Sequence, residues 1–267
     1  MTLVLVIPTV AGLIVAADSR LGISTPDWTI VCDNVFKITE VEGVDRTVVF
    51  TSGYGTIWAL AGVQTDKVCE HVASNKPKFD AQAILANTAR GPGASLEDIA
   101  REVVLATAAY IASHPADYAT RIGQFLFQSA LARFDPDTRR ASVESFSVTL
   151  GVDLSVSATD LKTQQYFPID GCGLKVFGEA NYLTNAVFNG PGRQFLGERY
   201  GRFRNAMTTI EHAEAESAAD FAVEIIEAAS RTTSIVPSET GIGGPVDIVL
   251  VGDDTRPQRL RWKSGGA

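Results

Sequence analysis

The fold of this chain is decided by its opening stretch, Thr2-Leu3-Val4-Leu5-Val6-Ile7, turn residues 8–12, and Leu13-Ile14-Val15-Ala16-Ala17-Asp18. Two short apolar runs bounded by turn residues are typical of a buried β-hairpin. The stretch is shorter than the roughly 18 continuous apolar residues of a membrane span. No basic segment precedes it, so it does not read as a secretory signal. We therefore expect a hairpin and no membrane association.

Thr2 stands directly behind Met1 and would gain a free α-amine if Met1 were removed. One residue would then supply a nucleophile, its γ-hydroxyl, and a base, an α-amine with an ordinary pKa of about 7.7–8.0. This pair can attack a carbonyl without a distant histidine. The alternative is an ordinary strand residue, and only the rest of the sequence can distinguish the two.

Composition predicts one domain over residues 1–267 with a large core. The net charge of −8 argues against a nucleic-acid surface. The three histidines are scattered, so no metal site or cofactor is expected. Cys32, Cys69 and Cys172 show no CxxC spacing, which favours free thiols in a reducing, cytoplasmic compartment.

Strands and helices are predicted to alternate in groups along the chain. The expected strands cover 3–7, 13–17, 29–35, 47–52, 123–134, 143–154, 164–177, 246–251 and 259–263. The expected helices cover 55–73, a segment starting at the capping residue Ser95, and 181–188, 194–202 and 217–231. Residues 74–94 look like an insertion between two helices, with no assigned role.

Further segments follow the opening hairpin in a fixed order: Val35-Phe36-Lys37-Ile38, then Val48-Val49-Phe50-Thr51-Ser52-Gly53, and finally Gly243-Gly244-Pro245-Val246-Asp247-Ile248-Val249-Leu250. Together they resemble the proteasome-type β-subunits. Phe177-Gly178-Glu179-Ala180-Asn181-Tyr182 is similar to the bacterial ancestral β-subunit group, Anbu, although Asn181 stands where that group tends to carry lysine. The resemblance implies an α+β fold, the four-layer αββα sandwich of N-terminal nucleophile hydrolases.

The resemblance also implies roles for individual residues. Thr2 corresponds to the nucleophile, Asp18 to a buried carboxylate, and Lys37 to the cation that pairs with it. Gly53 corresponds to the oxyanion donor through its backbone N–H. Arg20 is expected beside Asp18 as an ion-pair partner, with a solvated surface arginine as the alternative.

The supporting hydroxyls of the family are not present in their usual places. Glu179 stands where proteasome β-subunits have a serine, and it could bind the terminal amine or simply begin a helix. Ser238 and Thr240 are candidates for the missing hydroxyl, as is Ser234.

The predicted function is a threonine-type amide hydrolase, a proteasome-like peptidase subunit of bacterial type. An amidase for a small or specialised amide is one alternative, and a catalytically silent ring subunit or a binding module are others. The resemblance implies a homo-oligomer, a ring or helical stack, and leaves open whether an ATPase or another regulator joins it. The charged closing strand at 259–263 also suits an edge that a neighbour covers.

Overall fold

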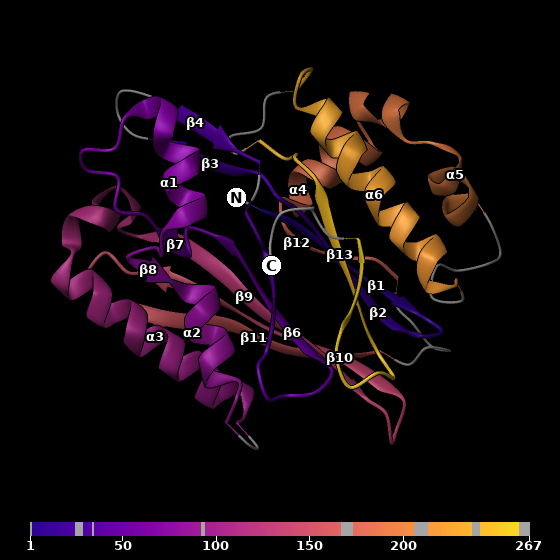
Figure 1. Cartoon of the computed structure of the whole chain (residues 1–267), viewed down its shortest axis with the longest axis horizontal. Helices are drawn as coiled ribbons and strands as arrows, with labels where there is room; N and C mark the ends of the chain where they lie inside the picture. Colours follow the sequence, from indigo (N-terminus) through magenta and orange to yellow (C-terminus); the bar gives the residue numbers. More distant parts are fainter. Residues whose placement is uncertain are drawn as a thin grey trace.

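Two five-stranded antiparallel sheets pack face to face in the computed structural model, and helices cover both outer faces (Figure 1). The structure describes residues 2–24, 29–33, 35–91, 94–166, 173–205, 213–236 and 241–261. The first sheet has the order β12 (Lys175–Gly178), β1 (Leu3–Thr9), β2 (Gly12–Asp18), β13 (Val246–Gly252), β14 (Gln258–Arg261). The second has the order β11 (Val156–Tyr166), β10 (Arg140–Leu150), β9 (Gln124–Asp135), β6 (Thr47–Gly53), β5 (Ile38–Glu40). The predicted αββα sandwich is confirmed.

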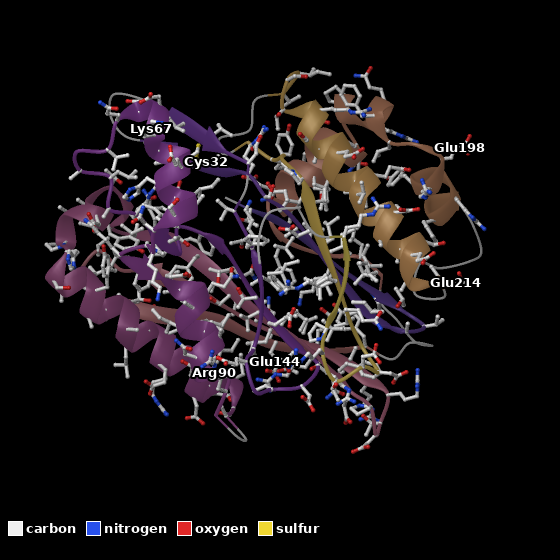
Figure 2. All side chains as sticks on the ribbon, viewed as in Figure 1. Cys32, Lys67, Arg90, Glu144, Glu198 and Glu214 are labelled. Atoms are coloured by element: carbon white, nitrogen blue, oxygen red, sulfur yellow. A yellow bond between two sulfur atoms is a disulfide. The ribbon has the colours of Figure 1, made fainter. Side chains whose placement is uncertain are left out.

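The opening hairpin lies at the centre of the first sheet and is buried on both faces. Successive side chains of a strand point to opposite faces. Val4 and Val6 therefore pack between the two sheets, whereas Leu3, Leu5 and Ile7 pack against the helices. Side chains fill the space between all four layers (Figure 2). Burial on both faces explains why this stretch is continuously apolar.

The outer layers come from two groups of helices. The first sheet is covered by α6 (Ala215–Thr232), whose buried face includes Phe221 and Ile225, together with shorter helices. These are α4 (Ala180–Tyr182), η3 (Leu183–Phe188), η4 (Pro191–Phe195) and α5 (Glu198–Asn205). The second sheet is covered by α2 (Ala81–Thr88) and α3 (Leu96–Ser113). The predicted cap is present, because Ser95 Oγ accepts the Asp98 N–H at 3.1 Å.

The helix predicted over 55–73 is wrong for its first ten residues. Thr56–Ile57 forms the short strand β7, which pairs with β8 (Phe79–Asp80), and the helical part begins at η1 (Thr65–Lys67) and α1 (Val68–Ser74). Trp58 and Leu60 pack against the small cluster around Val68, so their spacing reflects this packing and not a helix. Residues 74–94, to which the sequence assigned no role, contain α2.

Two of the longer predicted strands have different boundaries in the structure. The strand predicted over 164–177 is the end of β11 followed separately by β12. The strand predicted over 143–154 ends at Leu150, where a turn leads into β11, and Leu154 there has a φ of 65°. The remaining elements are the hairpin of β3 (Leu21–Ser24) and β4 (Thr29–Cys32) and the 3-10 helix η2 (Pro115–Arg121).

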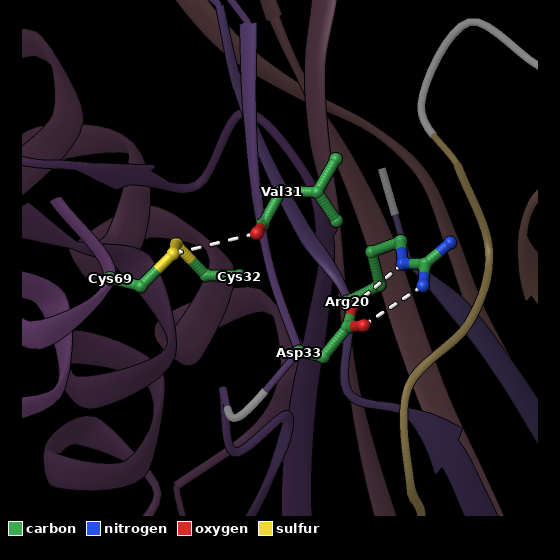
Figure 3. The surroundings of a disulfide bond; sticks show 5 residues. All are labelled: Arg20, Val31, Cys32, Asp33 and Cys69. Atoms are coloured by element: carbon green, nitrogen blue, oxygen red, sulfur yellow. Dashed lines mark hydrogen bonds and ion pairs between the residues drawn. A yellow bond between two sulfur atoms is a disulfide. The ribbon is translucent and has the colours of Figure 1, made fainter. Parts of the chain in front are cut away.

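The expectation of free thiols is wrong for two of the three cysteines. Cys32 of β4 and Cys69 of α1 form a disulfide, with Cα atoms 5.3 Å apart (Figure 3). They are 37 residues apart in sequence, and only the docking of α1 onto β4 brings them together. Cys172 lies outside the described residues. The inference of a reducing compartment rested on free thiols and loses its basis. No helix in the described ranges combines the length and apolar character needed to cross a membrane.

Candidate active site

The Asp18 carboxylate is the centre of the candidate site, at the end of β2 and with no exposed surface. Its Oδ1 accepts a hydrogen bond from the Lys37 ammonium at 2.8 Å and another from the Leu3 N–H at 2.9 Å. Its Oδ2 accepts the Gly243 N–H at 3.2 Å. A buried carboxylate is stable only when it is paired and hydrogen-bonded, and these three donors satisfy that requirement. The predicted pairing of Asp18 with Lys37 is therefore present.

Lys37 lies just before β5 and is 5% exposed. Its Nζ also donates to the Arg20 carbonyl oxygen at 2.5 Å. Burial lowers the pKa of the Lys37 ammonium, and the carboxylates of Asp18, Asp247 and Asp33 act in the opposite direction. Asp247, fully buried in β13, is a part of this charge cluster to which the sequence analysis assigned no role.

Thr2 is 8% exposed and directly precedes β1. Its neighbour Leu3 donates to Asp18 and pairs with Gly178 of β12. Gly178 has a φ of +83°, and a Cβ there would stand 1.7 Å from the Thr2 carbonyl oxygen. Only glycine fits this contact. The backbone of Thr2 is thus held between the Asp18–Lys37 pair and the end of β12.

Gly53 ends β6 with a φ of +106°, and a Cβ on it would clash with the Leu126 carbonyl oxygen at 2.6 Å. The preceding residue, Ser52, has its Cβ 3.3 Å from the position of a Gly178 Cβ. The end of β6 therefore faces the strand end that holds Thr2. Gly53 was expected here from the sequence, whereas Ser52 and Gly178, which lie in the same two motifs at 48–53 and 177–182, were not.

The sequence predicted an ion pair of Arg20 with Asp18, but Arg20 pairs with a different carboxylate. Its Nε and Nη2 donate to the two carboxylate oxygens of Asp33, at 2.7 and 2.9 Å (Figure 3). This guanidinium holds the pKa of Asp33 below its usual range. Asp18 already has three donors, which explains the different partner. Ser19 also binds Asp33, because its Oγ donates a hydrogen bond to the Asp33 backbone carbonyl oxygen at 2.7 Å.

The expected supporting residues are only partly placed. Glu179 follows Gly178 and occupies the N-cap position of α4, where its side chain makes no capping hydrogen bond. Burial raises the pKa of Tyr182, and the charge of Glu179 adds to this shift. Ser234 Oγ donates to the Arg231 carbonyl oxygen after α6. Ser238 and Thr240 lie outside the described residues. Within the described part of the chain, no three His, Cys, Asp or Glu side chains gather as a metal site.

No protein-family model and no curated protein matches the sequence. Among solved structures, the chain is similar to an Anbu (Gly-1) mutant from Hyphomicrobium sp. strain MC1. Identity is 14%, the match covers 97% of this chain and 87% of that chain, and the TM-score is 0.45. It is also similar to Thiobacillus denitrificans BPH, with and without epoxomicin. Identity is 14% in both, 95% of this chain and 100% of those chains are covered, and the TM-scores are 0.41 and 0.39.

The first of these structures bears the name Anbu, the group whose motifs this sequence resembles. At this level of similarity they assign no residue role in this chain. The fold class, a four-layer α+β sandwich of two antiparallel sheets between helix layers, is defined by the strand order and helix layers of the chain itself.

Proposed function

We propose that this chain is an N-terminal threonine nucleophile amidohydrolase, a proteasome-like peptidase in which Thr2 acts after removal of Met1. One observation carries the proposal: the buried Asp18–Lys37 pair is hydrogen-bonded to the N–H of Leu3, the residue next to Thr2. Buried ion pairs are poor devices for stability. Charged groups buried beside a potential nucleophile are typical of catalytic sites.

In the proposed reaction, Thr2 Oγ attacks the amide carbonyl carbon while the Thr2 α-amine accepts the hydroxyl proton. The backbone N–H of Gly53 stabilises the oxyanion. Collapse breaks the C–N bond, the proton passes to the leaving amine, and a Thr2 ester remains. Water then hydrolyses this ester and regenerates the hydroxyl. The nearby charge of Lys37 disfavours the ammonium form of Thr2 and so keeps its amine available as a base.

A small or specialised amide is the second candidate substrate. The observation that favours it is Glu179, which puts a carboxylate beside Gly178 where peptidases of this class carry serine. Comparison of peptide amides with small primary amides as substrates distinguishes the two.

The test combines mass spectrometry with an epoxyketone probe, which reacts with a hydroxyl and a free amine on one residue. We expect loss of Met1, labelling of the parent protein and of Thr2→Ser, and no labelling of Thr2→Ala. Thr65→Ala is the matched control, because Thr65 is an exposed threonine at the start of η1. Equal labelling of Thr2→Ala and the parent refutes the proposed nucleophile.

Assembly into a closed ring or helical stack is part of the same proposal, since a chamber would restrict access to the nucleophile. Light scattering coupled to gel filtration tests it. A mass near that of one 28.5 kDa chain refutes the chambered assembly and leaves a free-standing amidase.

A further inference from the structure

We propose that the hydroxyl of Ser52 is a positioning group that accepts an N–H of the Thr2 amine and orients it toward Thr2 Oγ. This inference rests on the proposed function. It supplies, from a different strand, the hydroxyl that is missing where Glu179 replaces the serine of related peptidases.

The strand pairing places Ser52 over the end of β12. Phe50 of β6 contacts Phe177 of β12 across the sandwich, with ring centroids 5.0 Å apart. Ser52 is two residues beyond Phe50, so it lies on the same face of β6. Gly178 is the next residue after Phe177 and pairs with Leu3. Ser52 therefore faces the point where the chain enters β1.

The distances around Gly178 give the same result. A Cβ built on Gly178 stands 3.3 Å from Ser52 Cβ and 1.7 Å from the Thr2 carbonyl oxygen. The distance from Ser52 Cβ to the Thr2 carbonyl oxygen is therefore at most the sum of these two distances. A serine hydroxyl at this range can reach polar atoms of Thr2.

The state of the hydroxyl indicates a missing partner. Ser52 is 2% exposed, and its Oγ has no hydrogen-bond partner among the described residues. Buried hydroxyls are nearly always hydrogen-bonded, because an unpaired one loses its contacts with water without replacement. Removal of Met1 turns the single amide N–H of Thr2 into an α-amine, which carries more than one N–H donor and can therefore bind a further acceptor.

Ser129 is the matched control. It is fully buried, and its Oγ likewise has no partner in the described part of the chain. It lies on β9 opposite Thr51, and its neighbour on the same face, Leu131, packs under α2 and α3. Ser129 thus faces away from Thr2 although its hydroxyl is in the same state as that of Ser52.

The experiment compares Ser52→Ala and Ser129→Ala with the parent on a fluorogenic peptide amide, by kcat, KM and the pH profile. We expect Ser52→Ala to lose about tenfold in kcat at unchanged KM, the effect of one positioning hydrogen bond. Its acid limb should move to lower pH, because an acceptor of N–H stabilises the ammonium form. Ser129→Ala should match the parent, and both variants should melt no lower than the parent.

Three outcomes overturn the inference, and they differ from one another. If Ser52→Ala matches Ser129→Ala in kcat and pH profile, Ser52 does not act on the amine. If Ser52→Ala melts well below the parent, its role is structural. A parent that neither cleaves the substrate nor reacts with the epoxyketone refutes the proposed function itself, and the inference with it.

Discussion

Replacement of Lys37 by Met tests whether the buried ion pair is organised as the structure shows. Lys37 and Asp18 have side chains that are 6% and 0% exposed, and their charged atoms are 2.8 Å apart. Removal of one partner of a buried pair leaves an uncompensated charge, which costs about 3–5 kcal/mol. We expect a loss of this size in the free energy of unfolding of Lys37→Met at pH 7, together with loss of activity.

The double variant Asp18→Asn/Lys37→Met separates charge from packing. With both charges removed, its loss should be smaller than the sum of the two single losses. Arg101→Met is the control for an exposed pair, because Arg101 and Asp98 are 63% and 49% exposed. A solvent-exposed pair of this kind contributes far less to stability than a buried one, so Arg101→Met should change the free energy of unfolding much less than Lys37→Met.

Urea unfolding at several pH values supplies the decisive measurement. In Lys37→Met the folded state holds a buried, unpaired carboxylate, so it binds a proton more readily than the unfolded chain does. Its stability should therefore fall as pH rises and recover on acidification toward pH 5. A loss below about 1 kcal/mol, or one that is independent of pH, refutes this account of the site.

Three other predictions follow from single features. Burial lowers the pKa of Lys37, so activity should decline with rising pH before an ordinary lysine loses its proton, near pH 10.4. Lys37→Arg, if active, should lack that decline. Identical pH profiles of the parent and Lys37→Arg contradict the prediction. Reduction of the Cys32–Cys69 disulfide, which spans 37 residues, should lower the free energy of unfolding by about 3–4 kcal/mol in urea titrations. An unchanged urea midpoint of the reduced protein counts against this prediction. Gly178→Ala should lower the melting temperature of the protein more than Gly173→Ala. Both glycines have a positive φ, at 83° and 77°, but only a Cβ at position 178 would meet backbone, that of Thr2. Equal melting temperatures would show that the contact has no effect.

Local sequence predicted the elements whose signals lie within a few residues. The opening hairpin is readable because both of its strands are buried on two faces and therefore continuously apolar. The start of α3 is readable from its serine cap, and the face of α6 from helical spacing. The stretch at 55–64 was misread because apolar residues that pack on β4 and α1 imitate helical spacing.

The sequence motifs, through their resemblance to proteasome-type β-subunits, were enough to predict the αββα arrangement and the pairing of Asp18 with Lys37. Only the tertiary structure decided which groups of separate elements meet. The disulfide of Cys32 with Cys69 and the approach of Ser52 to the end of β12 join segments far apart in the chain. The ion pair of Arg20 with Asp33 depends on the pairing of β3 with β4, which brings the two residues to the same end of that hairpin. Such contacts depend on how strands and helices dock, and residue spacing along one strand carries no information about docking.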